Sequence, residues 1–211
     1  MTTPSPKNRR AVPDERREML VAATVRCLVR DGHAGISVRR IATEAGVSVG
    51  LLNHHFGSID ALIADTYQKI ANELTTALLH EIQQVGTPAE KMDAFLKGSF
   101  SPRVMDPQLL SVWVVFWSLI RHSEHVSLSH EKSYRAYLDL LRQLLDDMAT
   151  SEGFVIHDTR LAAIGLSAML DGLWIEWCLN PETFSPANGL HICRCWIKGL
   201  RHGAFSADDV L

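Results

Sequence analysis

Apolar residues recur at helical spacing along most of the chain, and no stretch of useful length alternates apolar and polar residues as a half-buried strand would. Capping residues, glycines and prolines interrupt this pattern and separate the predicted helices. The helices are expected at residues 14–31, 37–45, 48–56, 58–85, 87–100, 106–122, 129–150, 158–179 and 185–203. The pattern therefore predicts an all-α protein with about nine or ten helices.

Residues 37–56 predict two short helices that are joined by a tight turn. The first helix has one apolar face, formed by residues at positions i, i+3, i+4 and i+7, namely Val38, Ile41, Ala42 and Ala45. Ser37 precedes this face as an N-cap, Gly46 ends the helix, and Ser48 caps the second helix. Two helices joined by a short glycine-containing turn are typical of a helix-turn-helix, whose second helix can enter the major groove of DNA.

The second of these helices contains no Lys or Arg, so uncharged residues and histidines would have to read the bases. Asn can pair with an adenine edge, Leu can touch a thymine methyl group, and Gly allows the backbone to approach closely. We therefore predict base contacts from Ser48, Val49, Gly50, Leu51, Asn53, His54 and His55. Adjacent helix residues point about 100° apart, which argues against a metal ion shared by the two histidines. We expect no metal and no cofactor.

Basic residues outside this helix are the predicted phosphate anchors. Arg39 and Arg40 lie on the polar face of the preceding helix, although a simple solvated face is the alternative interpretation. Residues 1–12 are polar and lack periodicity, so we expect a disordered arm. Its basic residues could reach the phosphates or the minor groove, or could belong to a solvated tail; they are Lys7, Arg9 and Arg10.

The segment around the predicted turn resembles the DNA-binding segment of the TetR family of transcriptional regulators. The resemblance is carried by Ile41-Ala42, Ala45-Gly46-Val47-Ser48, Leu52, His55 and Phe56, with Ser58 and Leu62 at the start of the next helix. It implies a three-helix DNA-binding domain followed by a helical domain that binds a ligand and dimerises. It also implies a repressor that a small effector releases from a palindromic operator.

Two later segments are similar to the betaine-choline (BetI-like) branch of that family. They are Trp113-Val-Val-Phe116-Trp117 and Met169-Leu170-Asp171-Gly172-Leu173-Trp174. That branch also lacks the tyrosine that many TetR proteins carry at the position of Asn53. The resemblance implies that the effector is a small organic cation.

The charge distribution agrees with contact to DNA at one end only. The net charge is −3, but residues 1–60 hold nine Lys and Arg against six Asp and Glu, so that the remainder carries −6. We expect a DNA-binding domain at residues 13–60 and a ligand-binding and dimerisation domain at residues 61–205. No apolar run appears long enough to span a membrane and no leader opens the chain, so we expect a cytoplasmic protein. The four cysteines follow no disulfide or zinc spacing and are interpreted as reduced thiols.

A cluster of aromatic residues and one carboxylate forms the predicted ligand site. Trp113 and Trp117 share a helix face, and Asp171 lies three residues before Trp174 in an apolar run. An isolated carboxylate there is costly, and a ligand cation would satisfy it while the indole faces attract the same charge. The predicted site comprises Trp113, Phe116, Trp117, Asp171 and Trp174, with Tyr134, Tyr137 and His122 as weaker candidates.

Other interpretations remain open at this point. The aromatic residues could be plain core packing, with Asp171 paired to an internal Arg or a backbone donor, in a DNA-binding protein without an effector. An all-α enzyme is a further alternative, although no nucleophile arrangement, Glu-x-x-His pair or phosphate loop is apparent. The predicted helices 158–179 and 185–203 carry more apolar surface than one stripe needs, which suggests a two-fold homodimer.

Overall fold

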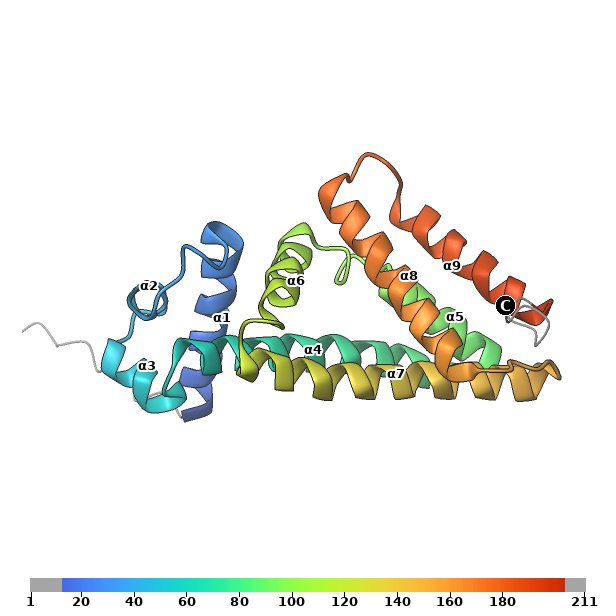
Figure 1. Ribbon diagram of the computed structural model, residues 1–211, viewed down its shortest axis with the longest axis horizontal. Helices are drawn as coiled ribbons and strands as arrows, with labels where there is room; N and C mark the ends of the chain where they lie inside the picture. Colours follow the sequence, from blue (N-terminus) through green and yellow to red (C-terminus); the bar gives the residue numbers. More distant parts are fainter. Residues whose placement is uncertain (1–12, 204–211) are drawn as a thin grey trace, which may run out of the picture. The chain divides into compact units, whose positions relative to one another are not determined.

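The computed structural model describes residues 13–203, which form nine α-helices and no strand (Figure 1). The helices are α1 (Pro13–Asp31), α2 (Val38–Glu44), α3 (Val49–Phe56), α4 (Ile59–Gln83), α5 (Pro88–Ser99), α6 (Pro107–Leu119), α7 (Glu124–Glu152), α8 (Thr159–Leu179) and α9 (Pro186–Arg201). The predicted all-α fold is confirmed. The predicted arm at residues 1–12 lies outside the described residues.

The helix starts follow the capping residues in the sequence. Asp106, Asp158 and Ser185 each accept a hydrogen bond from a backbone N–H in the first turn, as their positions before an apolar run predict. The predicted start of α7 at residue 129 is wrong, because Ser123 caps the helix and Glu124 begins it. The polar first turn of α7 hides this start from a search for apolar periodicity.

The chain divides into two compact units between Thr66 and Tyr67, inside α4. The sequence places the boundary near residue 60, where α4 begins. The difference arises because the first two turns of α4 belong to the core of the first unit, in which Leu62 is fully buried. In this unit α1 packs on α2 and α3 through Leu20, Ile41 and Leu52, each with no exposed surface.

In the second unit α7 is the central helix and packs against both α5 and α8. Its buried residues Leu141, Leu145 and Met148 share one core with Phe95 of α5 and Leu166 of α8. From Tyr67 onward, α4 runs beside α7 (Figure 1), and the Gln68 side chain donates a 2.8 Å hydrogen bond to Ser133 Oγ.

Among residues 13–203, α8 alone has the length and composition of a membrane span, which the sequence analysis did not expect. Its inward side is packed with α7 and α9, whereas Leu161 and Leu179 are exposed on its outer surface. The high apolar content therefore reflects a helix with two apolar sides, and one of them is covered within this chain.

Gly189 permits the close packing of α9 against Phe100 at the end of α5. A Cβ added at Gly189 would lie 2.4 Å from Phe100 Cε1, and Phe100 is 6% exposed, so its ring has little room to move. We expect Gly189→Ala to lower the free energy of unfolding by about 1–3 kcal/mol through overpacking. Urea denaturation measures this difference.

The substitution Phe100→Leu provides the control, because it removes the ring atoms that the added methyl group would meet. In the Phe100→Leu background, Gly189→Ala should lower the free energy of unfolding clearly less than it does in the parent protein. Equal costs in the two backgrounds would show that the contact does not set the stability.

Candidate functional site

The turn between α2 and α3 is held by side-chain caps and by one glycine. Ser37 Oγ accepts from the backbone N–H of Arg40 at 3.3 Å, and Ser48 Oγ accepts from Leu51 N–H at 3.2 Å. Gly46 has a φ of +67°, a backbone conformation that residues with a Cβ rarely adopt. The chain therefore turns sharply at Gly46, and α3 starts immediately after Ser48.

One face of α3 is anchored and the rest is available to a partner. Leu52 is fully buried and fixes the helix on the core of the first unit, while Phe56 packs at the edge of that core. The exposed residues of the cap and helix are Ser48, Val49, Gly50, Asn53 and His54, and Leu51 and His55 are half-buried. All seven residues predicted to read bases thus retain accessible surface, and none of them carries a fixed positive charge.

The two predicted phosphate anchors differ in their surroundings. Arg40 donates a 2.6 Å hydrogen bond to the carbonyl of Gly35 and lies 3.4 Å from the Asp31 carboxylate. Arg39 is exposed and has no ion pair or hydrogen bond within residues 13–203. Arg39 is therefore the more available of the two for a phosphate, and Arg40 also steadies the turn before α2.

A network of ion pairs braces α2 against α1. Glu44, the last residue of α2, accepts from Arg26 at 2.7 Å and from Arg30 at 3.0 Å. Hydrogen bonds from these two arginines lower the pKa of the Glu44 carboxyl group, and that from Arg30 lowers the pKa of Asp31. These pairs are solvent-exposed, so they orient the helices more than they stabilise them.

A chamber of about 120 Å³ lies within the second unit, among α4, α6, α7 and α8. Trp113 and Trp117 of α6 line it together with Asp171 and Trp174 of α8. Tertiary packing therefore brings together four of the five residues that the sequence suggested for a ligand site. The other aromatic residues in the lining are Tyr67, His130, Tyr134 and Tyr137.

Ring contacts and hydrogen bonds fix the aromatic walls. The Tyr67 ring lies edge-on to Trp113, with centroids 5.1 Å apart, and its hydroxyl is 2.9 Å from His130 Nδ1. Trp174 Nε1 donates to the carbonyl oxygen of Ser99 at 2.9 Å. Phe116 is fully buried behind this wall, where it contacts Tyr67 and Trp113. It supports the wall and does not line the chamber.

Asp171 is the charged residue in this chamber. Its carboxylate has no hydrogen bond or ion pair from any residue between 13 and 203, and burial raises its pKa to about 6. Burial also raises the pKa of Tyr67 and Tyr137, and the nearby Asp171 carboxylate contributes in both cases. The site is therefore a carboxylate held among aromatic faces without a counter-charge from the described part of the chain.

Two hydroxyl groups in the same chamber also lack partners. Tyr137 Oη and Ser167 Oγ are buried, and neither makes a hydrogen bond within the described residues. Buried polar atoms in folded proteins are normally paired, so unpaired ones in a cavity indicate a bound water or ligand. Together with Asp171 they give the chamber one negative charge and two hydrogen-bonding groups.

Sequence reasoning missed Tyr67, His130 and Ser167 as lining residues. Each lies at an ordinary helical position on an otherwise apolar or mixed face, so nothing in the local pattern separates it from core packing. Tyr134 and Tyr137, weaker candidates from the sequence, do line the chamber, whereas His122 is exposed elsewhere.

Comparisons with known proteins give a family match for each of the two units. Residues 20–66 match the profile of bacterial regulatory proteins of the tetR family, and residues 88–202 match the BetI-type transcriptional repressor C-terminal domain. The HTH-type transcriptional regulator BetI 2 of Chromohalobacter salexigens is 30% identical over 88% of this chain and 88% of its own length. The BetI regulator of Vibrio parahaemolyticus is 28% identical over 81% of this chain and 84% of its own.

Solved structures show the same fold. A protein of Pseudomonas aeruginosa PAO1, described as a transcriptional regulator, superposes with a TM-score of 0.88 at 42% identity, over 95% of this chain and 98% of its own. A regulator from Saccharomonospora viridis in complex with choline has a TM-score of 0.77 at 18% identity, over 88% of this chain and 96% of its own.

A helix-turn-helix followed by a helical unit with an internal chamber defines a DNA-binding regulator with a ligand-binding domain. The chain belongs to the TetR family of bacterial transcriptional regulators and has a BetI-type C-terminal domain. Its family and relatives are regulators, so the prediction that it is not an enzyme is confirmed.

The raised pKa of Asp171 predicts that the free energy of unfolding of the ligand-free protein falls as the pH rises. The folded state keeps a proton that the unfolded chain releases between about pH 4 and pH 6, so the carboxylate lowers stability as the pH rises through this window. We expect Asp171→Asn to raise the free energy of unfolding by about 1–3 kcal/mol at pH 8 and by roughly half as much at pH 5.

Urea denaturation at the two pH values tests this, with Asp139→Asn on the exposed side of α7 as the control for loss of one carboxylate. A gain from Asp171→Asn that is the same at both pH values would contradict a buried, unpaired carboxylate.

Proposed function

We propose that the protein is a cytoplasmic homodimeric repressor that binds a palindromic operator and leaves it when a small organic cation occupies the chamber. The observation that carries the effector class is the Asp171 carboxylate, which lies among three tryptophans without a counter-charge from residues 13–203. The relatives' description as BetI regulators and the choline complex of a structural neighbour support the same class.

At the DNA end, α3 enters the major groove and its exposed residues meet the base edges. Asn53 pairs with an adenine, and the half-buried Leu51 contacts a thymine methyl group. Arg39, which is exposed and without an internal partner in the described residues, contacts a phosphate. Affinity then depends on phosphate contacts outside α3, because α3 itself supplies no Lys or Arg.

At the ligand end, the cation stabilises the charged form of Asp171 and packs against the indole faces. Cation–π contacts contribute about 0.5–2 kcal/mol each in sites shielded from water. Tyr137 and Ser167 offer hydrogen bonds to any polar group that the ligand carries beside its charge. A ligand with a net negative charge is excluded by the same carboxylate.

Chain connectivity links the chamber to the first unit. Tyr67 lines the chamber, and the residue before it in the same continuous helix ends the first unit. A ligand that favours one position of Tyr67 against His130 and Trp113 thereby favours one arrangement of α4. Ligand binding shifts the equilibrium only by its difference in affinity for the two arrangements.

The dimer forms through the outer surfaces of α8 and α9. Within the described residues these surfaces expose Leu161 of α8 and Ile192 of α9, at 51% and 43%. Ala168 and Gly172 of α8 are also exposed and carry little or no side chain, so a second helix can approach closely there. A two-fold pair would cover the second apolar side of α8 and would present two α3 helices to successive major grooves.

The DNA contacts are tested by variants of different character. We expect Arg39→Ala to weaken binding to all duplexes alike and to reduce the salt slope of log K by about one. Asn53→Ala should instead reduce the preference for the operator over a mismatched site, by about 1–3 kcal/mol at the contacted base pair. Fluorescence anisotropy over a range of salt concentrations measures both effects.

Lys132→Ala on the exposed face of α7 is the charge-matched control for Arg39→Ala and should leave the salt slope unchanged. If Arg39→Ala leaves it unchanged as well, the arginine is part of a solvated face.

The effector class is tested by titrating the purified protein with tetramethylammonium and choline while heat and tryptophan fluorescence are recorded. We expect Asp171→Asn to weaken binding of either cation at least about tenfold, because the ligand charge loses its buried partner. Asp139→Asn should bind as the parent does. Absence of binding to the parent protein would remove the cation as effector while leaving the DNA-binding function intact.

A further inference from the structure

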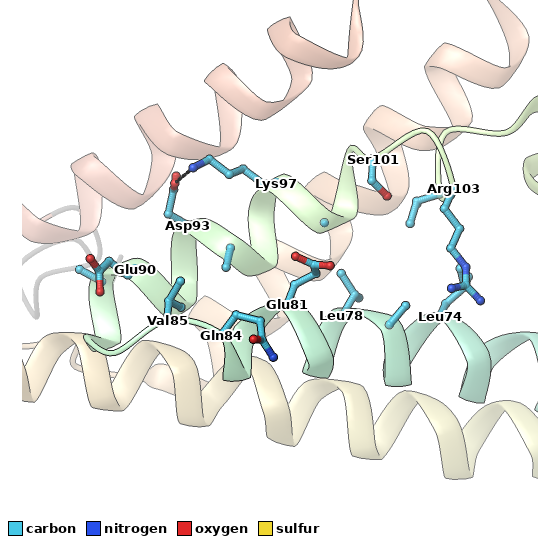
Figure 2. A pocket seen from close by; sticks show the side chains of 15 residues that line it. Leu74, Leu78, Glu81, Gln84, Val85, Glu90, Asp93, Lys97, Ser101 and Arg103 are labelled. Carbon is cyan, nitrogen blue, oxygen red and sulfur yellow. Dashed lines mark ion pairs between the residues drawn. The ribbon is translucent and has the colours of Figure 1, made fainter.

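A groove of about 780 Å³ lies next to the chamber in the second unit and takes no part in the function proposed above. It is bounded by the second half of α4, by α5 and by the turn at residues 101–104 (Figure 2). Its floor is apolar and includes Ala77, Val85 and Ala94. The chamber alone, at about 120 Å³, is small beside ligand sites of ~300–1,000 Å³, and the groove falls within that range.

Three aliphatic residues separate the groove from the chamber. Leu74, Leu78 and Val104 line both cavities, so they form a thin shared partition. Leu78 lies against α5 so closely that a Cβ at Gly98 would be 2.6 Å from its Cδ2. Leu74 is only half-buried, whereas Leu78 and Val104 are buried. An apolar chain therefore crosses the partition most easily at Leu74.

Two of the three carboxylates in the groove have side-chain or backbone partners. Glu90 closes the capping box of α5 with Thr87, and Asp93 accepts hydrogen bonds from Lys97 and Arg194. The side chains of Glu81 and Arg103 have no hydrogen bond or ion pair in the described part of the chain. Figure 2 shows Glu81 projecting from α4 toward α5 midway along the groove, and Arg103 at the end near Leu74.

The pairing of these charges leaves the Glu81 carboxylate open to a cation. Three carboxylates face three basic groups once Arg194, which pairs with Asp93, is counted, so the groove is neutral overall, while Asp171 gives the chamber a negative charge. Glu81 and Arg103 are both exposed, but Glu81 projects midway along the groove and Arg103 lies at the end near Leu74 (Figure 2), so a cation can meet Glu81 away from Arg103. The two compartments together therefore match a ligand with two positive charges joined by an apolar chain.

We propose that the chamber and the groove are two compartments of one effector site, and that the effector is an elongated organic dication with one charge at Asp171 and the other at Glu81. This inference rests on the proposed function, because it takes the cation at Asp171 as given. The connecting chain crosses Leu74, Leu78 and Val104.

The helix geometry sets a minimum length for this ligand. Glu81 follows Leu74 by seven residues on α4, which is ~10 Å along the helix axis. A ligand that crosses at Leu74 must therefore place its second charge about 10 Å farther along α4, past Leu78, on a chain of about ten bonds. A short diamine or a single ammonium head group fills the chamber but leaves Glu81 without a partner.

Isothermal titration calorimetry of the full-length protein with three quaternary ammonium probes separates the contributions of the first charge, the apolar chain and the second charge to the affinity. They are tetramethylammonium, decyltrimethylammonium and decane-1,10-bis(trimethylammonium). We expect the bis-cation to bind at least about tenfold tighter than tetramethylammonium, since its methylene chain buries apolar surface on the partition. We also expect it to bind roughly threefold to fivefold tighter than decyltrimethylammonium, because an exposed ion pair with Glu81 adds a modest further gain.

Glu81→Gln should reduce the preference for the bis-cation over decyltrimethylammonium to near unity. Glu73→Gln, which removes a carboxylate from α4 outside the groove, should leave the preference as in the parent. If the two ten-carbon probes bind equally well to the parent, or if Glu81→Gln preserves their difference, the dication inference is overturned while a short-cation effector stands. If tetramethylammonium itself fails to bind, the proposed cation function falls, and this inference falls with it.

Discussion

The packing of α8 on α7 holds a carboxylate where a protein normally has none. Leu166 and Leu170 on α8 are fully buried in the core of the second unit, and this packing fixes the side of α8 that faces the chamber. Asp171 follows directly and is turned toward three indole rings, without a counter-charge in residues 13–203. The core therefore supplies the stability that the unpaired carboxylate costs, and the cationic effector proposed above would offset part of that cost.

The charges of the DNA-binding unit are arranged differently from those of the ligand chamber. Its recognition helix carries no fixed positive charge, and the arginines around it are largely engaged in ion pairs with Glu44 and Asp31. These pairs hold α2 against α1, and the two serine caps fix the starts of α2 and α3, so specificity can come from uncharged groups in a fixed orientation. A single helix, α4, belongs to both units and ends the first at Thr66, directly before a residue that lines the chamber.

Much of this protein was predictable from local patterns in the sequence. Caps such as Ser37, Ser48, Asp158 and Ser185 act within one helical turn, so the helix starts that they mark could be recognised without any tertiary knowledge. The all-α class and the helix-turn-helix follow from the same short-range periodicity. Trp113, Trp117, Asp171 and Trp174 stood out because charge or aromatic bulk is unusual at those helical positions, and the fold places all four around one chamber.

Tertiary structure alone decided which residues complete that chamber and which only support it. Phe116 is as aromatic as Trp113 in sequence, but its position on α6 turns it into the core. Tyr67, His130 and Ser167 come from three helices, and the groove beside Leu74 and Leu78 is lined by residues of both α4 and α5. Periodicity shows which face of each helix is apolar, but which faces meet depends on contacts between residues far apart in the chain, and no local pattern encodes that choice.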